Sequence, residues 1–317
     1  MLFSPVQMHI PDGFLSLPVA LLLWAISVVV VGYALRRANR DLEERQVPLM
    51  GVLAAAIFAG QMLNFSVTGG TSGHLLGAAL ATILLGPWAA VLVITTVVGV
   101  QALIFQDGGL LALGGNLFNM AVIGVAVSYT VYRTAQKLAG NRRQGIFLGG
   151  FAAAWFSIVA AALACAIELA ASGTSRADLA ILAMGVIHML IGIGEGLITL
   201  GALAFLQATR PDLLQAGLAR TVHGGLVWAF GLGIALLLAV ASPLASAHPD
   251  GLMWVAEQKG FLEAARGPLY KIIPGYAVPG ISNSAAATIL AGVLGTLLVF
   301  GLALAIAYLR RQRHSAG

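Results

Sequence analysis

Apolar residues dominate this chain in long segments, which short polar or glycine-rich stretches separate. A helix needs about 20 consecutive apolar residues to cross the hydrocarbon core of a membrane, and most of the segments approach or exceed that length. The third is shorter and is expected to tilt or to pack as a partial helix. The predicted helical segments are residues 15–35, 48–67, 74–85, 88–105, 116–131, 146–171, 179–206, 224–244 and 285–309.

The last two segments are organised differently from those before them. After Pro211, one apolar segment leads to a polar outer stretch that starts at His248, and a final apolar segment ends in basic residues. We therefore predict an all-α integral membrane protein, built as a polytopic bundle of about seven helices plus a two-helix C-terminal module. The expected divisions are an N-terminal extension (1–7), a main membrane domain (8–214) and the module with its outer PDG segment (215–317).

The composition supports a membrane protein. Of the 317 residues, 59% are hydrophobic and 9% are charged, and the mean hydropathy is +0.94. Soluble domains carry roughly a quarter charged residues, so the composition excludes an ordinary soluble protein. Cys165 is the single cysteine, which excludes a disulfide within the chain, and we expect it to be a small residue in a packed helix.

Basic residues are distributed unequally between the two sides that the predicted segments define. Cytoplasmic loops carry an excess of Lys and Arg, and of the 17 such residues only Arg176, Lys259, Arg266 and Lys271 fall on the other side. This predicts an outer N-terminus and a cytoplasmic C-terminus. It also places two histidine-bearing stretches and the loop 106–109 together on the outer side.

The first of these stretches is MHIPDGF, which begins at Met8. If Met8 is the amino terminus, its amine, the deprotonated amide nitrogen of His9 and the His9 imidazole form a planar chelate of three nitrogens. One further imidazole closes a square, which is the geometry that Ni(II) or Cu(II) prefers, with Co(II) a neighbour. The alternative is that His9 is an interfacial histidine and that Met8 has no role.

The second stretch is the loop from Asn64 to His74, rich in glycine and hydroxyl residues. Glycine lets backbone segments approach closely, and irregular backbone at membrane depth must be covered by protein or line a cavity. We therefore predict a loop folded into the protein. It lacks the lysine of a phosphate-binding P-loop, and taken alone His74 could be structural.

Four motifs in order identify a family resemblance: MHIPDGFL, NFSVTGGTSGHLLGAALATILLGPWAA, FQDGGLLALGGNLFNM and HMLIGIGEGLIT. Together they resemble the substrate-capture component of the energy-coupling-factor (ECF) nickel and cobalt transporters, the CbiM/NikM family, over about Met8 to Pro211. The resemblance implies that the Met8 backbone amine, the His9 amide and imidazole and the His74 imidazole hold the ion. It also implies a prokaryotic plasma-membrane protein, with the metal as substrate and no cofactor of its own.

The same resemblance implies partners. A capture component works with a transmembrane coupling subunit (EcfT/CbiQ/NikQ-like) and cytoplasmic ATPases (EcfA/CbiO/NikO-like). The present chain contains no P-loop signature, and we expect neither an enzyme nor a nucleic-acid-binding protein.

The C-terminal stretches PDGLMWVAEQKGF and YAVPG resemble the PDGLE-type accessory subunit, CbiN/NikN-like, of the same transporters. Met253 stands where the family has Glu. The fusion slightly favours nickel as the substrate, and His248 is expected to be a plain loop histidine.

Seven residues precede Met8, and an acylated Met8 nitrogen cannot act as an amine ligand. We therefore expect translation to start at Met8, or the extension to be removed.

Further polar residues could support the site. A metal-bound histidine usually donates its second ring nitrogen to an oxygen acceptor, although each candidate could equally cap a helix or satisfy a loop. The candidates for this support are Asn64, Gln106, Asp107, Asn116 and Asn119.

Ionisable groups within the predicted segments have competing explanations. His188 and Glu195 are seven residues apart and share one helix face. Ionisable groups inside a membrane are costly, and this pair is expected to lie deeper in the membrane than His74. The pair either couples metal binding to movement of the protein or stabilises helix packing. Glu168 is expected at a solvated helix end.

Small residues at Gly51, Ala55 and Ala59 allow close helix contact. That contact could lie within the chain or, as the resemblance implies, on the coupling subunit.

Two other classes of protein fit the sequence less well. An intramembrane metalloenzyme would use His9, His74 and His188 around a catalytic ion, but no H-E-x-x-H pattern is present. A secondary transporter with inverted repeats finds little support because no half of the sequence is duplicated.

Overall fold

The computed structural model describes residues 7–41, 46–140, 143–214 and 224–315. The helices and strands are α1 (Leu17–Asp41), α2 (Gln46–Gln61), β1 (Phe65–Val67), β2 (Thr71–Gly73), α3 (Ala78–Leu85), α4 (Pro87–Ile104), α5 (Leu113–Leu117), the π-helix η1 (Phe118–Ile123), α6 (Gly124–Leu138), α7 (Arg143–Ala171), α8 (Ala177–Thr209), η2 (Pro211–Leu213), α9 (Gly224–Ala241), η3 (Ser242–Leu244), α10 (Gly251–Lys259), η4 (Leu262–Ala264), η5 (Pro274–Tyr276) and α11 (Ser284–Ser315).

The described residues contain six helices that are long and apolar enough to cross a membrane. Two shorter apolar helices accompany them, at Gln46–Gln61 and Trp228–Leu244, and α3 is a partial helix, as its short apolar segment predicted. The predicted class, an all-α membrane protein, is confirmed. The reason is that a chain in lipid must satisfy its backbone hydrogen bonds internally, which favours helices.

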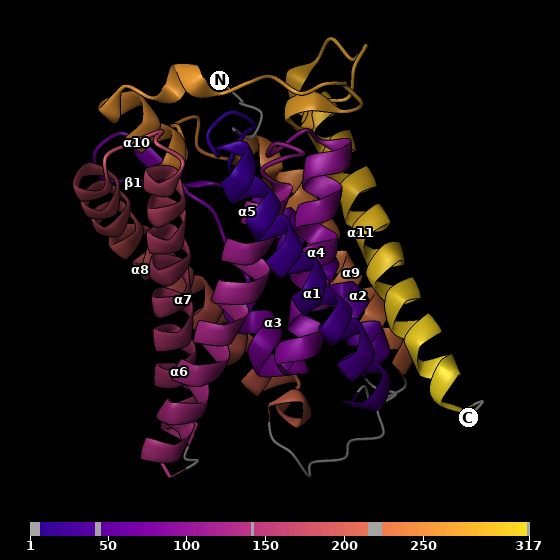
Figure 1. Ribbon diagram of the computed structural model, residues 1–317. Helices are drawn as coiled ribbons and strands as arrows, with labels where there is room; N and C mark the ends of the chain where they lie inside the picture. Colours follow the sequence, from indigo (N-terminus) through magenta and orange to yellow (C-terminus); the bar gives the residue numbers. More distant parts are fainter. Residues whose placement is uncertain (1–6, 42–45, 141–142, 215–223, 316–317) are drawn as a thin grey trace.

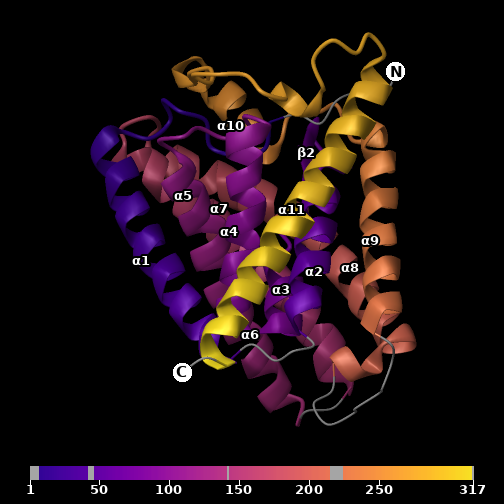
Figure 2. The same ribbon diagram turned by 90° about the vertical axis from the view of Figure 1, so that its right-hand side faces the viewer.

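The bundle is built around α4, which has 67% of its most apolar stretch buried, against 22% for α1 at the periphery. Helices α6, α7 and α8 pack side by side, and α9 and α11 pack against α2 (Figures 1 and 2). The two C-terminal helices therefore do not stand apart from the bundle.

Small residues allow this close packing of α11 on α2. A side chain at Gly51 would come within 3.1 Å of the Phe300 ring on α11, and Ala55 and Ala59 are fully buried. The small-residue face of α2 is therefore used within this chain.

The predicted helical segment 48–67 is wrong at its end. Helix α2 ends at Gln61, and β1 pairs with β2 in an antiparallel hairpin in which Ser66 lies opposite Ser72. Gly69 and Gly70 form the turn with φ of +91° and +79°, a region that glycine enters at little cost. Hydrophobicity alone could not separate a short strand from the end of a helix.

Two other predicted boundaries also differ. The fifth segment, predicted at 116–131, is one continuous helical stretch from Leu113 to Leu138 with a π-helical turn inside it. The polar stretch after α9 contains a short helix, α10, where no helix was predicted.

One end of the bundle gathers segments that are far apart in the sequence. The segment before α1, the β1–β2 hairpin, the loop after α4 and the stretch from α10 to α11 all lie at the upper end in Figure 1, opposite the C-terminal end of α11. Both histidine-bearing stretches are therefore at the same end.

Candidate metal site

The segment before α1 is held in place by side chains of the loop and helix that follow α4. Asn116 accepts a hydrogen bond from the Ile10 amide at 2.9 Å and donates one to the Ile10 carbonyl at 3.1 Å. The carboxylate of Asp12 accepts from the amides of Leu110, Leu111 and Ala112. Met8 and His9 are fixed by these bonds, and each is only 3% exposed.

Gly108 allows the loop after α4 to approach this segment. Its φ is +92°, and a Cβ there would lie 2.9 Å from the His9 Cβ and 2.8 Å from the Asn116 amide nitrogen. Both the backbone conformation and the space require glycine. The preceding residue, Asp107, is thereby brought against Met8 and His9.

Three nitrogens of Met8 and His9 converge on the Asp107 carboxylate. The Met8 and His9 amides donate to its Oδ1 at 2.8 and 3.2 Å. His9 Nδ1 lies 3.2 Å from Oδ2, a distance that fits an ion pair, but the contact does not have the geometry of a hydrogen bond. These are the nitrogens that the predicted chelate would use.

Tyr276 completes the surroundings of Asp107. Its hydroxyl donates to Oδ2 at 2.6 Å, and its fully buried ring stacks on Phe105 with centroids 4.9 Å apart. Burial by itself would raise the pKa of Asp107, but the charge and contact of His9 and the hydrogen bonds from Tyr276 and Met8 outweigh it and lower the pKa to about 2. Asp107 is therefore ionised at neutral pH, beside His9.

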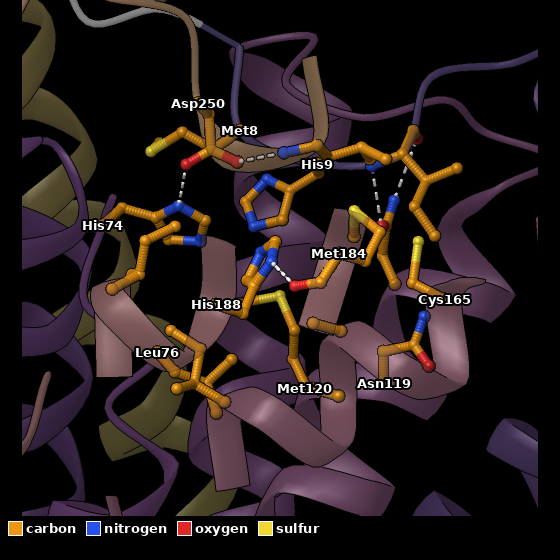
Figure 3. A pocket seen from close by; sticks show the side chains of 17 residues that line it. Met8, His9, His74, Leu76, Asn119, Met120, Cys165, Met184, His188 and Asp250 are labelled. Carbon is orange, nitrogen blue, oxygen red and sulfur yellow. Dashed lines mark hydrogen bonds and ion pairs between the residues drawn. The ribbon is translucent and has the colours of Figure 1, made fainter. Parts of the chain in front are cut away.

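His74 lies next to His9, with ring centroids 5.7 Å apart in an edge-to-face arrangement. Its Nδ1 is 2.9 Å from Asp250 Oδ1 (Figure 3). Burial alone would lower the pKa of His74, but the neighbouring Asp250 carboxylate raises it above the ordinary value of 6.5.

A pocket beneath these residues is lined by further polar and sulfur-bearing side chains (Figure 3). His188 lies below His9 in that view, and its Nδ1 is 2.8 Å from the Met184 carbonyl. His188 was expected to lie deeper than His74, and it shares one pocket with both other histidines. The pocket is also lined by Met120, Asn116, Asn119, Cys165 and Asp250.

Four of the candidate residues do not line this pocket: Asp107, described above, and Asn64, Gln106 and Glu195. Gln106 donates to the Leu103 and Ile104 carbonyls, and Glu195 accepts from the amides of Leu76 and Gly77. Glu195 thus fixes the turn that leads from His74 into α3, and among the described residues it forms no hydrogen bond or ion pair with His188. The side chain of Asn64 is buried without a hydrogen-bond partner in the described part of the chain.

Glu168 corrects one expectation. It was expected at a solvated helix end, but it is 6% exposed and accepts a hydrogen bond from Asn119 at 2.9 Å. The helix end was assigned as solvated because the tertiary contact with η1 is not visible in the sequence.

Asp250 and Tyr276 are the residues that the sequence analysis missed. Both come from the C-terminal third and contact residues 176 and 169 positions away. One signal was available: the Pro-Asp-Gly at 249–251 repeats the Pro-Asp-Gly at 11–13, and both were predicted on the outer side.

The side chains alone do not form a complete metal site. Within the described ranges, no three His, Cys, Asp or Glu side chains are placed to hold one ion. A metal–nitrogen bond of about 2.1 Å puts the centre of an imidazole about 3 Å from the ion, so two rings on one ion have centres within about 6 Å. His9 and His74 meet that condition, and the remaining ligands must come from elsewhere, such as the main chain.

Comparison with known proteins identifies the family of this chain. Residues 9–213 match the family model CbiM, described as a cobalt uptake substrate-specific transmembrane region, and residues 225–312 match the PDGLE domain. A putative fused nickel transport protein NikMN of Archaeoglobus fulgidus is 38% identical over 302 residues, covering 94% of this chain and 98% of the relative. A putative metal transport protein of Haloquadratum walsbyi is 44% identical over 207 residues, covering 65% of this chain and 93% of the relative.

A solved structure is also similar. The crystal structure of a truncated transition metal transporter matches with a TM-score of 0.57 and 37% identity, covering 64% of this chain and 99% of that one. The fold and the relatives define the class: this is a multi-pass membrane protein of metal-ion transport, not an enzyme. The chain belongs to the CbiM family of nickel and cobalt transport components, here fused to a PDGLE domain.

Proposed function

We propose that this chain is the substrate-capture component of an ATP-driven ECF-type importer of Ni(II) or Co(II). Residues 8–214 capture the ion, and residues 215–317 form the accessory module. The observation that carries the proposal is the convergence of the Met8 and His9 nitrogens at one point, with the His74 ring 5.7 Å from the His9 ring. The ligands would be the Met8 amine, the His9 amide and imidazole, and the His74 imidazole, once residue 8 is the amino terminus.

Charge supports a doubly positive substrate. Asp107 and Asp250 are 1% and 2% exposed, and their ion pairs within the described residues are with histidines alone, not with Lys or Arg. A buried carboxylate needs a compensating positive charge. A divalent cation bound by His9 and His74 would supply that charge.

Nickel is slightly favoured over cobalt. Relatives that share both parts of this chain carry names of nickel transport, including the probable fused nickel transport protein LarMN of Lactiplantibacillus plantarum, which is 35% identical over 259 residues and covers 75% of this chain. A planar set of four nitrogens also suits Ni(II).

ATP-driven transport requires other chains, namely a coupling subunit and ATPases, with the metal site facing outward. The test is uptake by sealed vesicles from cells that make this chain together with those subunits, with Ni(II), Co(II) and Zn(II) mixed at equal concentrations outside. We expect Ni(II) to accumulate only when ATP is trapped inside. Uptake without ATP, or accumulation of Zn(II) in preference to Ni(II) and Co(II), would contradict the proposal.

Acidification should weaken metal binding by this protein. A histidine must be neutral to bind a metal, and the pKa of His74 lies above 6.5 because of Asp250. Protons therefore compete with the metal for His74 already at a pH above 6.5, and metal binding should decline as the pH falls through the raised pKa of His74. Ni(II) affinity measured by equilibrium dialysis between pH 5 and 8 checks this, and a flat profile over that range would exclude His74 as a ligand.

A further inference from the structure

Asp250 is a buried carboxylate from the C-terminal third that reaches the metal site. Its Oδ1 lies 2.9 Å from His74 Nδ1, and the residue is 2% exposed. Figure 3 shows it above the pocket that also contains His9 and His188. It precedes α10 directly, in the outer segment between α9 and α11.

The backbone of this outer segment is docked on the hairpin that leads to His74. The Ser72 amide donates to the Pro249 carbonyl at 2.8 Å, and the Ser72 hydroxyl donates to the His248 carbonyl at 2.9 Å. Thr71 adds a hydrogen bond to the Pro249 carbonyl at 3.1 Å. Residues 248–250 thus run alongside β2, and the position of Asp250 is fixed relative to His74.

The following residue fixes the segment from the other side. A Cβ at Gly251 would lie 2.8 Å from the Ile191 Cδ1 and 3.0 Å from the His188 Cε1. The segment therefore sits against α8 as closely as its backbone allows, directly over the pocket.

We propose that Asp250 is a positioning residue for His74, through which the C-terminal outer segment completes the metal site. This inference rests on the proposed function. A carboxylate at Nδ1 holds the proton on that nitrogen, which leaves the lone pair on Nε2 and fixes the direction in which the ring presents it. Such a partner orients a metal-bound imidazole and increases its basicity.

The coupling between docking of residues 248–250 and metal binding at His74 must be reciprocal. If docking of residues 248–250 raises the affinity of His74 for the ion, then the ion strengthens the docking of that segment by the same factor. Ni(II) should therefore slow amide hydrogen exchange in α10 as well as in the segment before α1.

Asp250 also has a purely structural role that the test must separate. Its side chain caps α10 by accepting from the Leu252 amide at 3.5 Å, a long contact. Ser and Asn cap helices about as well as Asp. Asp250→Ser therefore keeps a cap but is too short to reach His74, and Asp250→Asn keeps a cap and a weaker, uncharged acceptor.

The experiment measures Ni(II) affinity of the full chain by equilibrium dialysis, with Ni(II) as the only metal. Losing a second-shell partner typically costs about 10- to 100-fold in metal affinity, so we expect that loss for Asp250→Ser and a smaller one for Asp250→Asn. Nitrogen-15 NMR of labelled histidine should show that His74 loses its preference for a proton on Nδ1. His248→Ala is the matched control, since that exposed side chain lies in the same segment, and it should bind as the wild type does.

Wild-type affinity in both Asp250 variants, with an unchanged His74 tautomer, would overturn the inference. If hydrogen exchange shows that Asp250→Ser loosens α10 without metal, Asp250→Asn decides: weaker binding supports the inference, and wild-type binding overturns it. His74→Ala distinguishes a failure of the proposed function from a failure of the role proposed for Asp250. Full binding by that variant would refute the proposed function itself, whereas lost binding there beside normal binding in both Asp250 variants refutes only the role of Asp250.

Discussion

His74→Ala should abolish retention of Ni(II) by the purified protein. The substitution removes one of the two imidazoles whose rings lie 5.7 Å apart, and the described part of the chain contains no group of three His, Cys, Asp or Glu side chains placed to hold one ion. The affinity should therefore fall by more than the roughly 100-fold that loss of a second-shell partner costs. Equilibrium dialysis against Ni(II), with metal analysis of the retained fraction, measures this.

The bundle should remain folded in that variant. His74 belongs to the loop before α3, and its loss leaves the buried Asp250 carboxylate without its histidine partner, a defect that costs at least about 1–3 kcal/mol because the group is charged. Thermal unfolding followed by circular dichroism gives the control, and His248→Ala should match the wild type in both measurements. Unchanged Ni(II) binding by folded His74→Ala would refute the ligand assignment.

His188→Ala gives a second comparison, because His188 lines the same pocket. If His188 were a ligand in a site of three histidines, its loss would be as damaging as the loss of His74. Since the main-chain nitrogens of Met8 and His9 complete the proposed site, we expect a smaller effect.

Exposure of the Met8 nitrogen as a free amine should determine whether tight binding occurs at all. With Gln7 attached, this nitrogen is an amide that donates to Asp107 at 2.8 Å. An acylated nitrogen cannot serve as an amine ligand, so a chain that starts at Met1 and keeps residues 1–7 should bind Ni(II) at least about 100-fold more weakly than a chain that starts at Met8, a loss as large as that of a metal-site partner.

Two preparations test this directly: one translated from Met8 and one from Met1, each checked by mass spectrometry of the N-terminus before dialysis. The matched control is a Met8 start that is acetylated on its amine, which should behave like the extended chain. Equal affinities in all three would mean that the amine is not a ligand. The fourth position would then require another group, for example the Met8 sulfur.

Much of the fold could be predicted from hydrophobicity because each membrane helix satisfies its own backbone hydrogen bonds. That condition makes helix positions a property of local composition, as for α4 and α7. Prediction from local composition fails outside the membrane-spanning helices. The segment that ends with Phe65–Val67 was apolar enough to be predicted as helix, but Gly69 and Gly70 turn it into a hairpin.

The candidate site could be predicted only in part. Met8, His9 and His74 were selected by donor chemistry and family resemblance, and charge topology placed the two histidines on one side. The structure brings their rings together. The carboxylates that contact those rings were harder to predict. Asp107 was one of five polar residues proposed to support the metal ligands, and Asp250 was not among them. Which carboxylate faces which imidazole depends on how the segments between the helices dock, and the repeated Pro-Asp-Gly at 11–13 and 249–251 does not specify that docking.

The sequence by itself determined that this is a helical membrane protein with two histidine-bearing stretches outside its apolar segments, because apolar length and donor type are properties of individual segments. Only the tertiary structure decided that Asp250 and Tyr276 from the C-terminal third lie against His74 and Asp107. Those contacts join positions more than 160 residues apart. They exist because the backbone of residues 248–250 pairs with β2 and the Tyr276 ring stacks on Phe105, and such interactions are settled by packing in three dimensions.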